Sequence, residues 1–349
     1  MEIYVNKLVS GAFERVSVLD TCISVIWITR YNSAGEGELY LAATEETVKL
    51  FEGETLLTRT DTDSVMLAES VEVQTDPEDG DRLIVKLISG EGILKRRIVP
   101  AQKTYSSVKG ENVLKALTTD NIISPSDSTR MISFFRNATS HGLGTTIQVQ
   151  VTGKNLLEKI SEIAKEQKLG FKVSWDGAWM TFDVYQGADK TDEVIFSPDF
   201  ENLGATNYEL DTSQHYTAAY VAGQGQGLDR VIVGTTDGTT GFERRETWVD
   251  ARNTSSQTEG GSMPAEEYEE ILEQQGQEVI ASHAVKVKFE GQILDVTGYV
   301  YGVDYGLGDI VSVQTGYGLN TSARVSEITE VEDEDGYKLI PTLSETEVW

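Results

Sequence analysis

The turn EDEDG at residues 332–336 places four carboxylates in succession, and carboxylate oxygens are the ligands that calcium prefers. A calcium loop also requires ligands at alternate positions and a bidentate glutamate after its glycine. Residues 337–340, with the sequence YKLI, supply no such glutamate. The pattern therefore predicts a solvated hairpin turn, and we expect no metal site.

The glycine-rich stretch GQGQG at residues 223–227 is superficially similar to a phosphate-binding loop. A dinucleotide site requires the spacing G-x-G-x-x-G between a strand and a helix. Residues 228–233, LDRVIV, instead predict a strand directly after the glycines. We therefore expect neither a nucleotide site nor any other cofactor.

The three histidines, His141, His215 and His283, are too scattered for a metal-ligand motif, and neither H-E-x-x-H nor C-x-x-C spacing occurs. No Ser/His/Asp or Cys/His arrangement supports nucleophilic catalysis. Counting leaves a glycosidase-type carboxylate pair open, because 57 acidic residues offer many accidental pairs. The sequence designates no catalytic residue, and we expect the protein not to be an enzyme.

Cys22 is the only cysteine, so an intrachain disulfide is excluded. It lies in the apolar run TCISVIWI, residues 21–28, which predicts a buried strand position. The one dense basic spot, Arg96 followed by Arg97, is typical of a solvated edge strand.

The balance of charge excludes the classes of protein that bind polyanions. The chain has 29 basic and 57 acidic residues and a formal net charge of −28, whereas nucleic-acid binding depends on cations that displace counterions. No apolar run approaches the roughly 20 residues that span a bilayer, and the N-terminus lacks a secretion-signal layout. We expect a soluble protein, made in the cytoplasm, that does not bind DNA.

The elements that would position these residues begin with a β region. The 349 residues exceed the usual size of one core, which favours two domains or one elaborated β domain. Alternating apolar residues predict strands at 25–29 and 38–41, and again at 65–73 and 82–88. Proline and glycine at 76–80 predict the turn of the second pair.

The pattern changes to α+β near residue 106. Helical spacing predicts helices at 111–117 and 153–168, the second with Thr152 as its N-cap and Gly170 as its stop. The pair Asp176-Gly177 between alternating runs predicts a β-hairpin.

Strands return after residue 207 and are interrupted by one long predicted helix. Pro264 in its first turn and the glutamates that follow favour a helix over 264–282. Its predicted buried stripe comprises Tyr268, Ile271, Leu272, Val279 and Ile280. Strands are predicted around it at 217–223, 230–234, 244–249 and from 285 onward, with turns at 290–291, 306–309 and 333–336.

Several of these segments, taken in order, resemble the tail-tip hub proteins of siphophages and related prophages. They are SVIWITRY at 24–31 with the following Gly turn and Glu38-Leu39, GILKRRIV at 92–99, VIFS at 194–197 with Glu201-Asn202-Leu203, YVAGQG at 220–225 and LGDIV at 307–311. Single pieces are common in phage tail proteins, and the ordered set extends over nearly the whole chain.

The resemblance implies a baseplate-hub-like fold with two small antiparallel β-barrels, similar to tail-tube domains, and α+β insertions. The expected domains are 1–105, a first barrel; 106–195, an α+β module; and 196–349, a second barrel with a helical insertion at about 253–283. Such hubs are typically trimers in which two barrels per subunit form a pseudo-sixfold ring that continues the tail tube.

The implied function is structural, at the tail tip of the virion. The implied partners are two further copies of the chain, the distal tail and tail-tube proteins, the tape-measure protein and other tail-tip or receptor-binding proteins. DNA would pass through the ring without specific binding, because an acidic wall repels phosphate. The alternative is a host-envelope-binding or peptidoglycan-cleaving tail protein, which would act on cell-wall material by itself; no cleaving domain is expected after the last strand.

On this hypothesis residues 306–309 form a tight corner that leads into a core strand and need no ligand. We expect Asp309 to accept hydrogen bonds from its own turn. An Asp309→Asn substitution is therefore expected to be mild.

Overall fold

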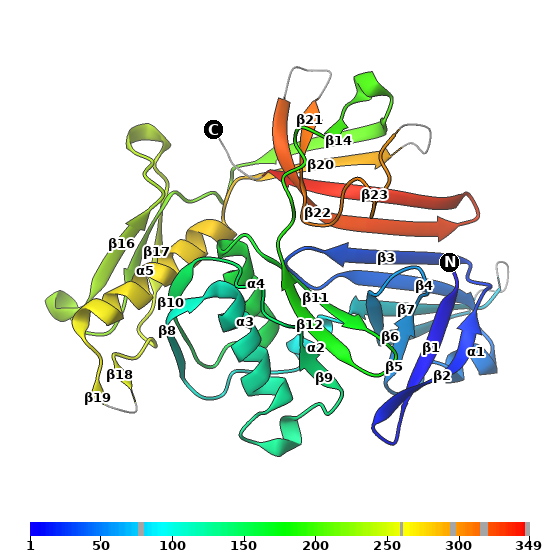
Figure 1. The fold of residues 1–349 in the computed structure, drawn as a ribbon, viewed down its shortest axis with the longest axis horizontal. Coiled ribbons are helices and arrows are strands. Elements are labelled where there is room, and N and C mark those ends of the chain that lie inside the picture. The colour runs from blue at the N-terminus through cyan, green and yellow to red at the C-terminus, as the bar shows by residue number, and fades with distance from the viewer. Residues whose placement is uncertain (76–79, 259–260, 294–297, 315–319, 346–349) are drawn as a thin grey trace.

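The computed structural model describes residues 1–75, 80–258, 261–293, 298–314 and 320–345. The protein is mainly β, with 43% strand and 20% helix, as the sequence predicts. In Figure 1 the blue N-terminal strands lie directly below the orange and red C-terminal strands, and the green helices lie beside them, towards the yellow helix α5. Every helix in the described ranges is too short or too polar to cross a bilayer.

The N-terminal β region is an antiparallel sheet whose alternating apolar residues form its core. Trp27, Leu39 and Val85 are fully buried in this core. The predicted turn at 76–79 lies outside the described residues. The elements of this region are β1 (Ile3–Val9), β2 (Ala12–Leu19), β3 (Ser24–Arg30), β4 (Glu36–Ala42), α1 (Glu45–Lys49), β5 (Thr55–Thr58), β6 (Val65–Gln74), β7 (Arg82–Ser89) and α2 (Gly92–Lys95).

Two expectations for this region are wrong. Arg96 and Arg97 follow the short helix α2 and do not lie on an edge strand; Arg96 is the C-cap of that helix. Cys22 precedes β3 and is only half buried, although it packs against the core and burial raises the pKa of its thiol to about 11.

The α+β module packs its helices against two small sheets. Its elements are β8 (Lys103–Lys109), α3 (Gly110–Thr118), the π-helical turn Thr119–Ile123, the 3-10 turn Ser128–Arg130, β9 (Phe135–Asn137), β10 (Thr146–Val151), α4 (Leu156–Glu166), β11 (Gly170–Trp175) and β12 (Met180–Tyr185). The predicted hairpin is confirmed, since β11 and β12 pair over their full length around Gly177, whose φ is +98°.

The predicted ends of helix α4 are wrong by a few residues. Asn155, rather than Thr152, caps its N-terminus: the Asn155 side-chain oxygen accepts from the backbone N–H groups of Leu157 (3.0 Å) and Glu158 (3.4 Å). Lys168, with φ +55°, follows the helix, and Gly170 already belongs to β11. Both asparagine and threonine can cap, and the chain uses the one that lies directly before the apolar stripe.

The C-terminal region contains a second β region and a helix-covered small sheet. Its elements are β13 (Ile195–Phe196), β14 (Leu203–Asp211), β15 (Ala218–Ala222), β16 (Ile232–Thr236), β17 (Glu246–Asp250), β18 (Gln257–Thr258), β19 (Gly261–Ser262), α5 (Ala265–Ser282), β20 (Lys286–Ile293), β21 (Ile310–Gln314), β22 (Asn320–Asp333) and β23 (Gly336–Glu345), with 3-10 turns at Pro198–Phe200, Gly227–Asp229 and Gly241–Glu243. The predicted turn at 290–291 is wrong, because β20 runs through it in register with β14.

Helix α5 covers one face of the sheet formed by β16, β15 and β17. Tyr268, Ile271 and Leu272 are buried there, as predicted, together with Val221 of β15. The remaining two stripe residues, Val279 and Ile280, are only half buried.

Strand β22 joins the two β regions into one sheet. Glu327 to Glu332 pair antiparallel with β3, from Arg30 back to Val25, while the other edge of β22 pairs with β23. In the described residues the strand order is β14-β20-β23-β22-β3-β4-β7-β6-β5-β1-β2, and β21 branches from the start of β22. Segments some 300 residues apart in the sequence thus lie side by side (Figure 1).

The corner at 306–309 is a tight turn, as predicted. The two carboxylate oxygens of Asp309 accept from the backbone N–H groups of Gly306 (2.8 Å) and Ala188 (2.7 Å). Gly308 has φ +96°, and a Cβ atom there would lie 2.2 Å from Cε2 of Tyr31. The corner therefore requires glycine for its backbone and also for the ring packed on it.

We predict that Gly308→Ala lowers the free energy of unfolding by about 3 kcal/mol or more. The alanine must adopt a left-handed backbone, at about 1–2 kcal/mol, and must also displace a buried ring. Gly302→Ala is the control, because Gly302 has φ +83° but open space around its Cα. Urea unfolding of both variants separates the two effects; equal losses would show that the contact with Tyr31 contributes nothing.

The expectation for Asp309→Asn changes with the structure. Both Asp309 oxygens accept from N–H groups, so an asparagine would turn its NH₂ group towards one of these donors. The substitution removes one hydrogen bond and leaves a donor facing a donor, and it is no longer expected to be mild.

Candidate functional site

The junction between the two β regions carries opposite charges on its two sides. Across the paired strands, Nε of Arg30 donates to Glu327 at 2.6 Å. Nη2 of Arg59, which directly follows β5, donates to Glu330 of β22 at 2.8 Å. The residues from 259 onward include 19 acidic and only 4 basic residues, so the N-terminal arginines supply the counter-charges that β22 lacks locally. Electrostatic complementarity thus fixes which strand pairs with β3.

Arg59 is the most enclosed charged group of this junction, with a side chain only 3% exposed. It also donates from Nε and Nη2 to the Asp61 carboxylate, at 2.9 and 2.6 Å, and its guanidinium lies 5.3 Å from the ring centroid of Trp27. Burial by itself would lower the pKa of Arg59, but the hydrogen bonds that Arg59 donates to Asp61 and Glu330 raise it. The guanidinium therefore stays charged in a fixed orientation.

Tyr31 directly follows β3 in the N-terminal β region, and it contacts both of the other parts of the chain, the α+β module and the C-terminal region. Its hydroxyl donates to the carbonyl of Lys168 in the α+β module at 3.1 Å. On the C-terminal side the Arg324 guanidinium lies 5.1 Å from its ring centroid, and the backbone N–H of Tyr31 donates to Ser326 at 2.9 Å. Its ring also packs against the backbone of Gly308, which can come this close because glycine has no side chain. Tyr31 thus fixes the relative positions of the three parts.

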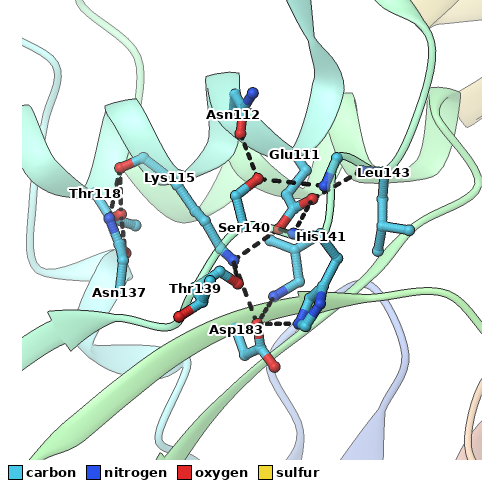
Figure 2. A network of polar contacts seen from close by, with 12 residues as sticks. Glu111, Asn112, Lys115, Thr118, Asn137, Thr139, Ser140, His141, Leu143 and Asp183 are labelled. Carbon is cyan, nitrogen blue, oxygen red and sulfur yellow. Dashed lines mark hydrogen bonds and ion pairs between the residues drawn. The ribbon is translucent and has the colours of Figure 1, made fainter.

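A second buried polar network lies inside the α+β module (Figure 2). The Glu111 side chain, fully buried, accepts from Nζ of Lys115 at 2.7 Å and from the backbone N–H groups of His141 and Leu143 at 2.8 Å each. Lys115 also donates to the carbonyl of Thr139 at 2.9 Å. Helix α3 is thereby held to the loop that follows β9.

The hydrogen bonds decide the charge state of Glu111. Burial raises the pKa of its carboxyl, but the hydrogen bonds from Lys115, Leu143 and His141 outweigh burial and lower the pKa to about 2. Because these donors already satisfy the Glu111 carboxylate, the network stabilises the fold.

Helices α4 and α5 are linked by a buried ion pair between Lys159 and Glu278. Burial by itself lowers the pKa of Lys159, but the adjacent Glu278 and Glu162 carboxylates raise it. The α+β module and the helix of the C-terminal region are therefore held together by charge as well as by apolar packing.

The candidates from the sequence do not converge on a metal or phosphate site. In the hairpin turn at 332–336, Asp333 accepts from the backbone N–H of Asp335 at 2.9 Å. The described residues contain no group of three or more His, Cys, Asp or Glu side chains placed to hold a metal. In the loop at 223–227, the backbone N–H of Gln224 donates to the hydroxyl of Tyr268 at 2.9 Å.

The three histidines occupy two separate places. His141 lies beside Asp183 in the α+β module, with 3.9 Å between Nε2 and Oδ1. His215 and His283 are brought together, since Nδ1 of His215 lies 3.2 Å from the backbone carbonyl of His283. Their contact joins the end of α5 to the chain before β15.

Large apolar side chains are exposed on the sheet face opposite α5. Tyr220, Ile232 and Trp248 point outward from β15, β16 and β17, with 38%, 49% and 55% of their surface exposed. Leu228 and Phe242, in the turns beside this sheet, are fully exposed. Such a concentration is typical of surfaces that are buried in an assembly.

The fold defined by this joined sheet and its helical modules is that of phage tail proteins. The structure is similar to a tail protein from Neisseria meningitidis MC58 (14% identity, 99% of this chain and 98% of that chain covered, TM-score 0.58) and to the 43 kDa tail protein of prophage MuSo2 from Shewanella oneidensis (13%, 98% and 98%, 0.58). Prophage tail protein gp18 from Listeria monocytogenes EGD-e is also similar (12%, 99% and 96%, 0.55).

The sequence matches the model of one family over residues 2–343. The chain belongs to the siphovirus ReqiPepy6 Gp37-like protein family. The resemblance to siphophage and prophage tail proteins is thereby confirmed. A comparison with curated protein sequences gave no match.

We predict that Arg59→Leu lowers the free energy of unfolding by about 3 kcal/mol, because it leaves the Glu330 carboxylate without its enclosed partner. Arg96→Leu is the matched control: its ion pair with Glu54 has the same 2.8 Å distance, but the two side chains are 36% and 50% exposed. That loss should stay below about 1 kcal/mol. Urea unfolding measures both, and similar losses would contradict the importance of the junction.

We also predict a pH-dependent contribution from Glu111. Its folded-state pKa is lowered to about 2 from an ordinary value of 4.5, so its stabilisation is complete above pH 4.5 and is lost as the pH falls towards 2. Glu111→Gln should cost about 2 kcal/mol at pH 7, and this difference from the wild type should shrink between pH 4.5 and 2.

The exposed Glu14 supplies the control for this measurement. Glu14→Gln should leave the unfolding free energy nearly unchanged at every pH. If the cost of Glu111→Gln were constant from pH 7 to 2, the carboxylate charge would not be the stabilising feature.

Proposed function

We propose that this protein is a structural component of the tail tip, a hub that forms a ring at the end of the tail tube and joins it to the host-facing tip. The observation that carries the proposal is the sheet made continuous by β3 and β22. It unites the two β regions of the chain in one rigid unit, which a ring subunit that presents both regions to its neighbours requires. The similarity to phage and prophage tail proteins over nearly the whole chain supports the same function.

The proposal includes two small antiparallel barrels, one from each β region, and the division 1–105, 106–195 and 196–349 with its helical insertion at about 253–283. Separate apolar clusters support it. One cluster lies between Ile3 and Leu87, one is centred on the α+β module and also takes in Leu56, Val65 and Ile88 of the N-terminal region, one lies between Val194 and Leu343, and one joins α5 to its sheet. Three copies would place six such barrels around a central channel.

The charge of −28 agrees with a channel that DNA crosses without binding, because an acidic wall repels phosphate. In this proposal the chain is not an enzyme and needs no cofactor. Its partners are two further copies, the distal tail and tail-tube proteins, the tape-measure protein and other tail-tip or receptor-binding proteins. The exposed apolar face of β15–β17 supports a location inside an assembly of the virion tail.

We predict that the assembled tail contains three copies of the chain and that self-association of the isolated chain strengthens with salt. Like charges oppose association, and the screening length falls from about 8 Å at physiological ionic strength to about 3 Å at 1 M. Light scattering at low and high salt gives the mass in solution. Electron microscopy of assembled tails gives the stoichiometry at the tip.

The two measurements distinguish the number of copies in the assembled tail from the oligomeric state of the isolated chain in solution. A monomer in dilute buffer agrees with the proposal, because neighbouring tail rings supply contacts that are absent in solution. One or two copies per tail, or a position away from the tip, would overturn it.

A further inference from the structure

A cavity of about 900 Å³ lies where the three parts of the chain meet. It is lined by Arg59 and residues 61–65 of the N-terminal region, by Lys172 and Tyr185 of the hairpin β11–β12, and by Tyr305 and Glu330 of the C-terminal region. Pockets that hold small molecules have volumes of about 300–1,000 Å³. The size and position therefore suit a small ligand that touches all three parts.

Two buried polar atoms among the lining residues have no hydrogen-bond partner within the part of the chain that the structure describes. These atoms are Nη1 of Arg59 and the hydroxyl oxygen of Tyr305, whose residues are 7% and 2% exposed. Buried polar atoms in folded proteins are nearly always paired. Because Asp61 and Glu330 fix the other nitrogens of the Arg59 guanidinium, Nη1 is an oriented donor for which the described residues provide no acceptor.

The charges around the cavity argue against an anionic ligand. The described lining residues include four basic and five acidic side chains. Arg59 is already neutralised by Asp61 and Glu330, and Lys172 pairs with Asp63 at 2.7 Å. An additional negative charge would meet these carboxylates, so the acceptor belongs to a neutral molecule.

The aromatic lining points to the class of that molecule. Five tyrosines line the cavity: Tyr185, Tyr299, Tyr301, Tyr305 and Tyr337. A tyrosine presents an apolar face and a polar tip, and the carboxylates beside it accept hydrogen bonds from hydroxyl donors. A sugar ring has apolar C–H faces and hydroxyl groups that both donate and accept, and it matches this combination better than an amide or a phosphate does.

We infer that the junction cavity is a binding site for a neutral saccharide of one or two rings. A ring hydroxyl accepts from Nη1 of Arg59, another bonds to the Tyr305 hydroxyl, and the tyrosine faces pack against the sugar. The inference does not depend on the ring proposed above, because every residue involved belongs to one subunit.

Calorimetric titration of the full chain tests this with maltose, lactose and N,N′-diacetylchitobiose as neutral probes, glucose 6-phosphate as an anionic probe and tetraglycine as a peptide probe. At least one neutral disaccharide should bind. Tyr305→Phe should weaken its binding about fivefold, the effect of one hydrogen bond, without lowering the thermal unfolding midpoint, because the hydroxyl has no hydrogen-bond partner among the described residues.

Tyr208→Phe is the control, since Tyr208 is 38% exposed on β14 and does not line the cavity. It should leave saccharide affinity unchanged. The inference is overturned if none of the three disaccharides binds, or if Tyr305→Phe and the control bind equally well. Preferred binding of glucose 6-phosphate or tetraglycine would also overturn it and would assign the cavity to an anion or to a peptide segment.

Discussion

The pairing of β3 with β22 is the constraint on which the rest of the structure depends. Six residue pairs join Val25–Arg30 to Glu327–Glu332 and turn two β regions into one sheet. Backbone pairing alone does not choose a partner strand, because every free edge presents the same N–H and C=O groups. Here the choice is made by side chains: arginines approach the junction from one side and glutamates from the other, and the ring of Tyr31 requires the Gly308 corner beside it.

Buried polar contacts add to shared apolar packing in connecting the parts of this chain. The buried Glu91 accepts from the backbone N–H of Val173 at 2.7 Å, and the pair Lys159–Glu278 links the two long helices. Such hydrogen bonds and ion pairs require strict geometry, and a buried polar group left without its partner costs free energy. Each interface between two parts of the chain therefore has one favoured arrangement.

Much of the fold could be predicted from the sequence, because alternation and helical spacing are local properties. The hairpin around Gly177, the helix α3 and the corner at 306–309 follow directly from them. The predicted N-terminus of α4 is wrong because Thr152 and Asn155 can both cap a helix, and the turn predicted at Gly291 is wrong because long-range pairing keeps β20 extended. Arg59 and Tyr305 could not be found in this way, since their importance comes from segments that meet only in three dimensions.

The same long-range pairing has a consequence for the order of events during synthesis. β3 leaves the ribosome about 300 residues before its neighbour β22, so its edge stays open through most of translation. Contacts so distant in sequence form late and slow the folding of the chain. A product that terminates before residue 327 keeps an unpaired strand edge, which favours aggregation and clearance. Only chains translated past this point can present both β regions in register.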